Sequence, residues 1–336
     1  MKKILLSILV TLMVTGVVFA EEKDIKLKAS GDVWAWITSS SASSGDTSVS
    51  SMTNNTYGLF GFEVSNNVGD YTTKSVLAFE GSDSTIGLYE LYAGIESKTM
   101  EYKLGYLDPS DVTQGMDYLP FWGEVFYNGI YVAQGNYISV GFKELKLDVA
   151  LGFNNIQHVA DTDTTADNSV DQTVLGVYYR GEFDALDLGF AYVMVDNKLD
   201  PNKNPTAEAT AYGDYGSTAI SLGVNYKMSE SIAFAVNLES VTESSANAKD
   251  VSSMKTNLSG DIGFDKKSGM TVATSSISTT DDSSNPTQFS RTEIGYARDY
   301  DDFQTGIAYF MESVKDTDTS QDDSTSGFLL GFFMGF

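Results

Sequence analysis

The sequence predicts an all-β fold, a transmembrane antiparallel β-barrel of about 16 strands, with 14 or 18 strands as alternatives. Three observations support this prediction: a strongly one-sided apolar segment at the C-terminus, short segments in which apolar residues alternate with small or polar ones, and connections that alternate between short and long. Together they indicate that lipid, and not a protein core, covers the apolar side of the sheet.

The last eleven residues are the most one-sided segment of the chain. Large apolar side chains occupy every second position: Phe328, Leu330, Phe332, Met334 and Phe336. The other face carries Gly327, Gly331 and Gly335. Because successive side chains of a strand point to opposite faces, one face is wholly apolar. A half-buried edge strand of a soluble sandwich is the alternative, but the pattern is typical of the last strand of an outer-membrane barrel.

The same alternation recurs along the chain. Four segments show it clearly: 145–153, 186–194, 220–227 and 232–239. In each, apolar residues alternate with small, polar or charged ones, which is the pattern of a barrel with lipid outside and water inside. A single strand of this kind proves little, and the repetition carries the prediction.

The connections alternate as well. The short ones are expected at 66–70, 97–99, 143–144, 183–185, 228–231, 265–268 and 299–302. The long ones are rich in Ser, Thr, Asp and Asn and are expected at 39–56, 108–127, 155–171, 196–217, 242–253, 279–286 and 314–325. An even strand number puts both termini on the side of the short turns, provided that 129–142 forms a single strand.

The N-terminus predicts export. Lys2 and Lys3 precede an apolar run over 4–18, and Val18-Phe19-Ala20 resembles a small-residue cleavage site. The run is shorter than the ~20 residues that a membrane-spanning helix needs, which disfavours a helical anchor. We therefore expect residues 1–20 to be a cleaved signal peptide and 21–336 to form a single barrel domain in the outer membrane.

Composition narrows the function. The formal net charge is −25, and removal of two lysines with the signal peptide brings it to about −27, which disfavours nucleic acid as a partner. The chain has no cysteine, and His158 is its single histidine, so thiol chemistry is excluded and histidine-based catalysis is disfavoured. We expect neither an enzyme nor a cofactor.

Three segments, in order, resemble those of the trimeric general porins of Gram-negative bacteria, over essentially the whole mature length. They are 25–34, then 60–69 followed by 76–80, then 91–95 through 102–106 leading into a long third loop. The resemblance implies a water-filled pore, a homotrimer and passive diffusion of small hydrophilic solutes. It also implies that Phe336 and the apolar face before it are a signal for the barrel-assembly machinery. Tyr106 stands where the family commonly has an arginine, which puts the usual arginine ladder in doubt.

The resemblance and the alternation together suggest a channel interior. The third loop, 108–127, is expected to fold inward and form a constriction from Asp108, Asp111, Asp117, Tyr118, Phe121, Trp122 and Glu124. Alternation places a pore wall at Glu63, Lys74, Glu80, Glu101, Lys103, Lys146, Asp148, Arg180, Asp187, Arg291 and Glu293. Carboxylates predominate, so a mild preference for cations is expected. An ordinary acidic surface loop is the alternative for 108–127.

Other readings concern the loops and the aromatics. The acidic run 161–167 and the group Asp316, Asp318, Asp322 and Asp323 lack the glycine and glutamate of an EF-hand, so no metal site is expected. Loose bridging of these acidic loops to lipopolysaccharide by divalent cations is an alternative. Outer-membrane lipid is the other partner expected around the barrel. Trp34, Trp36 and Trp122 are interpreted as girdle or packing residues. An adhesin or structural surface protein, or a substrate-specific channel, is the alternative function.

Overall fold

The computed structural model describes residues 25–335 except 45–46, 83–84, 108–134, 158–168, 200–214, 246–247, 282–286, 302 and 317–320. It contains sixteen strands in this part of the chain: β1 (Lys26–Ser44), β2 (Thr47–Val68), β3 (Tyr71–Ser82), β4 (Thr85–Glu96), β5 (Met100–Leu107), β6 (Gly135–Phe142), β7 (Leu147–Gln157), β8 (Ser169–Phe183), β9 (Leu186–Leu199), β10 (Tyr215–Lys227), β11 (Ile232–Ser245), β12 (Ala248–Asp265), β13 (Ser268–Asp281), β14 (Thr287–Asp299), β15 (Gln304–Asp316) and β16 (Gln321–Gly335). Among these residues no helix is long and apolar enough to cross a membrane.

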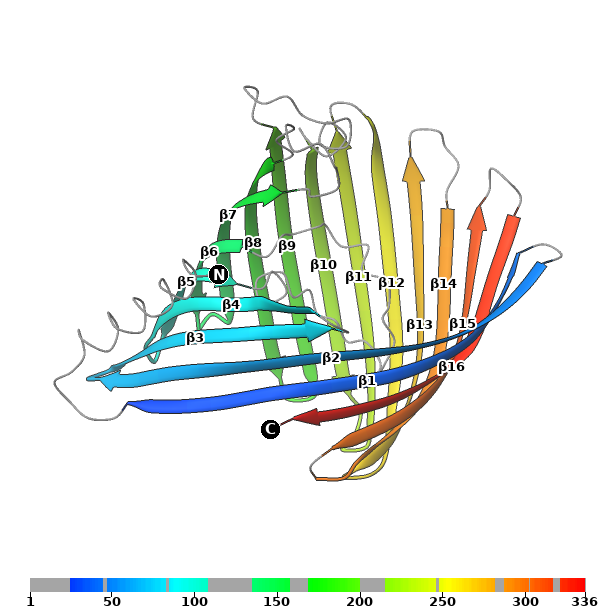
Figure 1. The fold of residues 1–336 in the computed structure, drawn as a ribbon, viewed down its shortest axis with the longest axis horizontal. Coiled ribbons are helices and arrows are strands. Elements are labelled where there is room, and N and C mark those ends of the chain that lie inside the picture. The colour runs from blue at the N-terminus through cyan, green and yellow to red at the C-terminus, as the bar shows by residue number, and fades with distance from the viewer. Residues whose placement is uncertain are drawn as a thin grey trace.

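The strands close into one antiparallel barrel. Each pairs with its neighbours in the sequence, and β1 closes the ring by pairing with β16. In Figure 1, β1–β4 run at a steep angle to β8–β14 on the other side, as expected when strands tilt around a barrel axis. The predicted 16-strand antiparallel barrel is therefore confirmed. Of the segment 129–142, which was expected to form one strand, the structure describes 135–142 as β6, and 129–134 lie outside the described residues.

The connections differ between the two ends of the barrel. Seven short turns join strands at what we call the turn end: 69–70, 97–99, 143–146, 184–185, 228–231, 266–267 and 300–303. The opposite, loop end carries the remaining connections. Both the first residue of β1 and the last residue of β16 lie at the turn end, as the even strand number requires.

The two faces of the sheet differ in chemistry, as the alternation predicts. Cross-strand pairing joins Val224, Val236 and Leu258 on the outer face, where each is more than a third exposed. The opposite, lumen face carries buried polar residues such as Asn237 and Asn257 at paired positions. An apolar exterior and a polar interior are the reverse of a soluble protein and suit a wall between lipid and water.

Three predicted loops are largely strand in the structure. The serine-rich stretch 39–56 forms the paired ends of β1 and β2, from Ser39 opposite Met52 to Ser44 opposite Thr47. The connections expected at 242–253 and 314–325 are shortened in the same way. The prediction took hydrophilic composition as a sign of a loop. Strands that rise beyond the apolar belt have no lipid to face, so their outer residues can be Ser or Thr while the backbone ladder continues.

The closure seam between β1 and β16 depends on a glycine. Phe328 and Leu330 point outward and are more than half exposed, while Gly327 faces the lumen. A Cβ atom at Gly327 would overlap the carbonyl oxygen of Ser39 and lie 2.9 Å from Cζ of Phe310. Glycine at this position allows the last strand to approach the first closely.

Aromatic rings gather on the outer side near the turn end. Phe303 stacks on Tyr300 and on Phe332, with centroids 4.9 and 5.4 Å apart, and Phe264 stacks on Tyr296 at 6.3 Å. Such a belt is expected where a barrel leaves the hydrocarbon and meets the membrane interface.

Several predictions fall on parts of the chain outside the described residues. These are the signal peptide 1–20, the third loop 108–127 with all its constriction residues, His158, the acidic run 161–167, Asp318 and Phe336.

Candidate functional site: the lumen face

Charged side chains are distributed over the lumen face of the barrel, and carboxylates outnumber cations there among the described residues. By strand register the carboxylates include Asp32, Glu63, Glu80, Glu90, Glu96, Glu101, Asp148, Glu182, Asp187, Glu239, Glu243, Asp261, Glu293, Asp299, Glu312 and Asp323. The cations are Lys26, Lys28, Lys74, Lys103, Arg180, Lys227, Lys255 and Arg291. Ten of the eleven residues expected in a pore wall lie on this face.

The eleventh, Lys146, lies elsewhere. It occupies the last position of the turn 143–146, with φ of 51°, so it precedes β7 instead of lying within it. The turn has four residues where two were expected: the amide of Lys146 donates a hydrogen bond of 3.3 Å to the carbonyl oxygen of Lys143. Tyr106 pairs with Leu91 on the outer face, so no side chain at this position enters the lumen.

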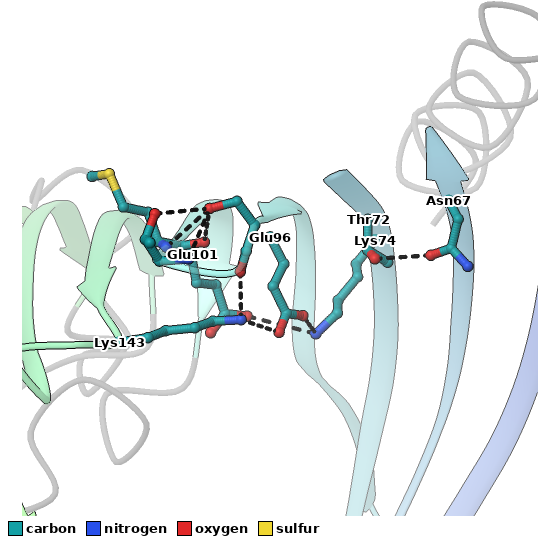
Figure 2. A network of polar contacts seen from close by, with 9 residues as sticks. Asn67, Thr72, Lys74, Glu96, Glu101 and Lys143 are labelled. Atoms are coloured by element: carbon teal, nitrogen blue, oxygen red, sulfur yellow. Dashed lines mark hydrogen bonds and ion pairs between the residues drawn. The ribbon is translucent and has the colours of Figure 1, made fainter. Parts of the chain in front are cut away.

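A charged network connects three strands near the turn end. Lys74 of β3 forms an ion pair with Glu96 of β4 and lies 3.7 Å from Glu101 of β5. Lys143, in the turn after β6, also pairs with Glu96 and donates a hydrogen bond of 2.8 Å to the carbonyl oxygen of Ser97 (Figure 2). Cations thus flank Glu96 on both sides, and Glu101 takes part in the network through its longer contact with Lys74.

A polar recess of about 120 Å³ lies beside this network. Its lining comes from β5, β6, β7 and β8: Glu101, Lys103, Ser139, Gly141, Asp148, Ala150 and Tyr178. Lys103 also lies over the ring of Tyr92, with Nζ 5.5 Å from the ring centroid. The recess has two carboxylates and one ammonium, so it can hold small cations and water against the wall.

The opposite wall carries a more deeply buried charge cluster. Arg291 donates hydrogen bonds of 2.8 Å to Glu312 and 2.9 Å to Glu293, and its guanidinium lies 4.7 Å from the ring centroid of Phe310. The side chains of Arg291 and Glu293 are 8% and 4% exposed. This arrangement fixes the guanidinium between two acids and an aromatic face, in the planar geometry that arginine favours.

Part of the lumen face is apolar, which the alternation did not predict. Val174, Val195 and Val241 are 0%, 1% and 2% exposed, and they form a cluster with Leu107, Tyr137, Ala150, Val193 and Ala219. These residues follow the inner wall from β5 to β11. The sequence contains the signal, since β9 alternates Val193 and Val195 with Tyr192 and Met194, so both of its faces are apolar there.

Aromatic side chains occupy the lumen face at the closure seam. Trp34 of β1 pairs with Tyr57 of β2 and with Phe333 of β16, at ring-centroid distances of 6.3 and 5.4 Å. Trp36 follows on the same face. Trp34 and Trp36 were interpreted as girdle or packing residues: a girdle lies on the outer face and does not agree with this placement, whereas packing agrees with the ring contacts of Trp34. The alternation in the sequence indicates the correct face, because both tryptophans share the parity of Asp32 and lie on the face opposite Val33.

The comparisons with known proteins agree with the barrel. The sequence model of the Gram-negative porin family matches residues 6–333. The fold is similar to OmpT in its trimer form, an outer membrane protein of Vibrio cholerae (10% identity, TM-score 0.66, covering 94% of this chain and 100% of that one). It is also similar to an anion-selective porin from Comamonas acidovorans (12%, 0.65, 93% and 100%) and to Salmonella typhi OmpF in complex with daunomycin (13%, 0.62, 93% and 98%). No curated protein matches the chain.

These similarities confirm the resemblance that the sequence motifs indicated. At such low identity the solved structures show the fold alone, whereas the family match covers nearly the whole chain. The family and the closed barrel indicate a channel of the outer membrane.

Proposed function

Because the chain belongs to the Gram-negative porin family, we propose that it forms a water-filled channel for passive diffusion of small hydrophilic solutes and ions, with a mild preference for cations. Barrels of 16 to 18 strands in porins are wide enough to enclose an aqueous channel. The observation that carries the cation preference is the excess of carboxylates on the lumen face, since acidic residues lining a pore favour cations.

The charged clusters indicate which carboxylates contribute most to the cation preference. Lys74 and Lys143 balance Glu96, and Arg291 balances Glu293 and Glu312, so these carboxylates act on ions less than their number suggests. Glu101 and Asp148 line the recess together with a single lysine, and Lys74 lies 3.7 Å from Glu101, farther than it lies from Glu96. We therefore assign them the larger part of the selectivity among the described residues.

The reversal potential in a potassium chloride gradient across a planar bilayer tests the proposal. We expect its sign to show K⁺ permeating faster than Cl⁻, and the variant Glu101→Gln with Asp148→Asn to move it toward zero. Asp196→Asn is the matched control, because Asp196 pairs with Lys198 on the outer face. A wild-type channel that prefers chloride would contradict the cation preference, and a protein without conductance would contradict the channel.

We also propose that the segment 108–127 narrows the channel. The apolar cluster on the lumen face supports this, because Val174 and Val195 are shielded from water although the lumen of such a wide barrel is aqueous. The segment begins directly after Leu107, itself a member of the cluster. Its Tyr118, Phe121 and Trp122 supply the apolar surface that would cover these valines, with its carboxylates toward water.

The oligomeric state of the channel is also inferred from the family. We propose a homotrimer, supported by the family and by the trimer form of the similar Vibrio protein. Lipopolysaccharide around the barrel and recognition of the C-terminal strand by the assembly machinery are proposed with it. A measurement of conductance distinguishes the channel from the adhesin alternative, because an adhesin does not need to conduct ions.

A further inference from the structure

Four aromatic side chains form a patch on the lumen face at the closure seam. This lumen aromatic patch consists of Trp34 and Trp36 of β1, Tyr57 of β2 and Phe333 of β16. Trp34 is central, since its ring meets Tyr57 and Phe333 edge-on at interplanar angles of 72° and 82°. The channel proposal does not use these residues.

The patch differs from the inner apolar cluster in being accessible at Trp34. Trp34 is 43% exposed, whereas the valines of the inner apolar cluster are at most 6% exposed. Packing across the seam needs no exposed tryptophan, because aliphatic pairs occupy the same seam on its outer face, Ile37 opposite Leu330 for example. A large aromatic ring that is exposed on the lumen face is accessible to a solute.

Carboxylates surround the patch. Tyr57 donates a hydrogen bond of 3.2 Å to Oε2 of Glu80 on β3. Asp32 precedes Trp34 on the same face, and its Oδ1 would lie 3.0 Å from a Cβ atom at Gly335. Along the cross-strand pairs of Asp32, Trp34 and Trp36, the described residues include no lysine or arginine. The local charge is therefore negative.

We propose that the lumen aromatic patch is a binding site for small organic cations in transit, with Trp34 as the principal contact. The ring quadrupole attracts an ammonium group placed over it, tryptophan most strongly of the aromatic residues. Asp32 and Glu80 add attraction that a neutral solute of the same size does not receive. The inference rests on the proposed channel and adds a class of solute to it.

Block of single-channel current by benzyltrimethylammonium measures binding at the patch, with glucose as the neutral comparison. We expect a concentration-dependent block of the wild-type channel by the cation and a weaker effect of glucose. Trp34→Leu keeps an apolar side chain in the seam but removes the π face, and is expected to weaken the cation block about 5-fold. Trp34→Phe keeps an aromatic ring and is expected to weaken the cation block less than Trp34→Leu does. Glu80→Gln is expected to weaken the block by the cation but not the effect of glucose.

Each result has a defined meaning. A conducting Trp34→Leu channel that is blocked as strongly as the wild type would overturn the proposal and leave the patch a packing device. Stronger block by glucose than by the cation, lost in Trp34→Leu, would also overturn it and make the patch a sugar site. Failure of the wild-type protein to conduct concerns the channel proposal instead. Calorimetric titration of the detergent-solubilised protein with the same cation then decides for or against the site.

Discussion

At the scale of single residues, the inner wall holds charges in two kinds of surroundings. Glu96 at the turn end lies between two lysines and is more than a quarter exposed, so water shares in its solvation. Arg291 and Glu293 are almost fully buried, and each depends on the other. Removing one member of a buried pair leaves an unpaired charge, whereas removing both can be nearly neutral.

The variant Arg291→Met tests this difference. It is expected to lower the free energy of unfolding by about 3 kcal/mol, because Glu293 loses its buried partner. The double variant Arg291→Met with Glu293→Gln should recover much of that loss. Urea titrations of the detergent-refolded barrel, followed by tryptophan fluorescence, provide the measurement. Arg298→Met serves as the control, because Arg298 is exposed near the turn end. Equal losses in the single and double variants would contradict the coupling.

At the scale of strands, the seam between β1 and β16 joins the two ends of the chain and completes the barrel. Gly327→Val is expected to reduce the yield of folded barrel severalfold, because its side chain would meet the backbone of Ser39. Gly58→Ala is the matched control, since its nearest neighbour would be the carbonyl oxygen of Asp32 at an ordinary 3.7 Å. Heat-modifiable migration in gels measures the folded fraction. A normal yield for Gly327→Val would show that the seam can open to accommodate the side chain.

Strand alternation also shows how far the sequence predicts the structure. The period of two identified the strands and their faces, so the register of Glu101, Asp148 and Arg291 toward the lumen could be anticipated. It could not show where strands end. Ser39–Ser44 has the composition of a loop, but a backbone ladder satisfies its hydrogen bonds whatever the side chains, so β1 continues to Ser44. The seam patch was missed because Trp34 and Trp36 were interpreted as girdle or packing residues by residue type, and their parity with Asp32 was not used.

At the scale of the whole molecule, the inner wall divides into sectors around the barrel axis. From β5 to β11 it includes the buried apolar cluster, and from β12 to β4 it includes partly exposed charged and aromatic side chains such as Glu312, Trp34 and Lys74. We expect the aqueous pathway of the proposed channel to follow the second sector, because water and ions gain nothing from shielded valines. The recess at Asp148 lies in the first sector near the turn end, where charged residues replace the valines.

This division makes the channel cross-section depend on what covers the apolar sector. Replacing 111–124 by a short Gly-Ser linker should increase single-channel conductance, because the proposed covering segment no longer narrows the lumen. It should also weaken the cation preference, since Asp111, Asp117 and Glu124 are removed. The matched control replaces 202–212, in the connection between β9 and β10, and should leave conductance unchanged. Conductance steps recorded in planar bilayers at high salt compare the two. Unchanged steps after the first deletion would mean that 108–127 lies outside the conducting path, and the shielded valines would then need another cover.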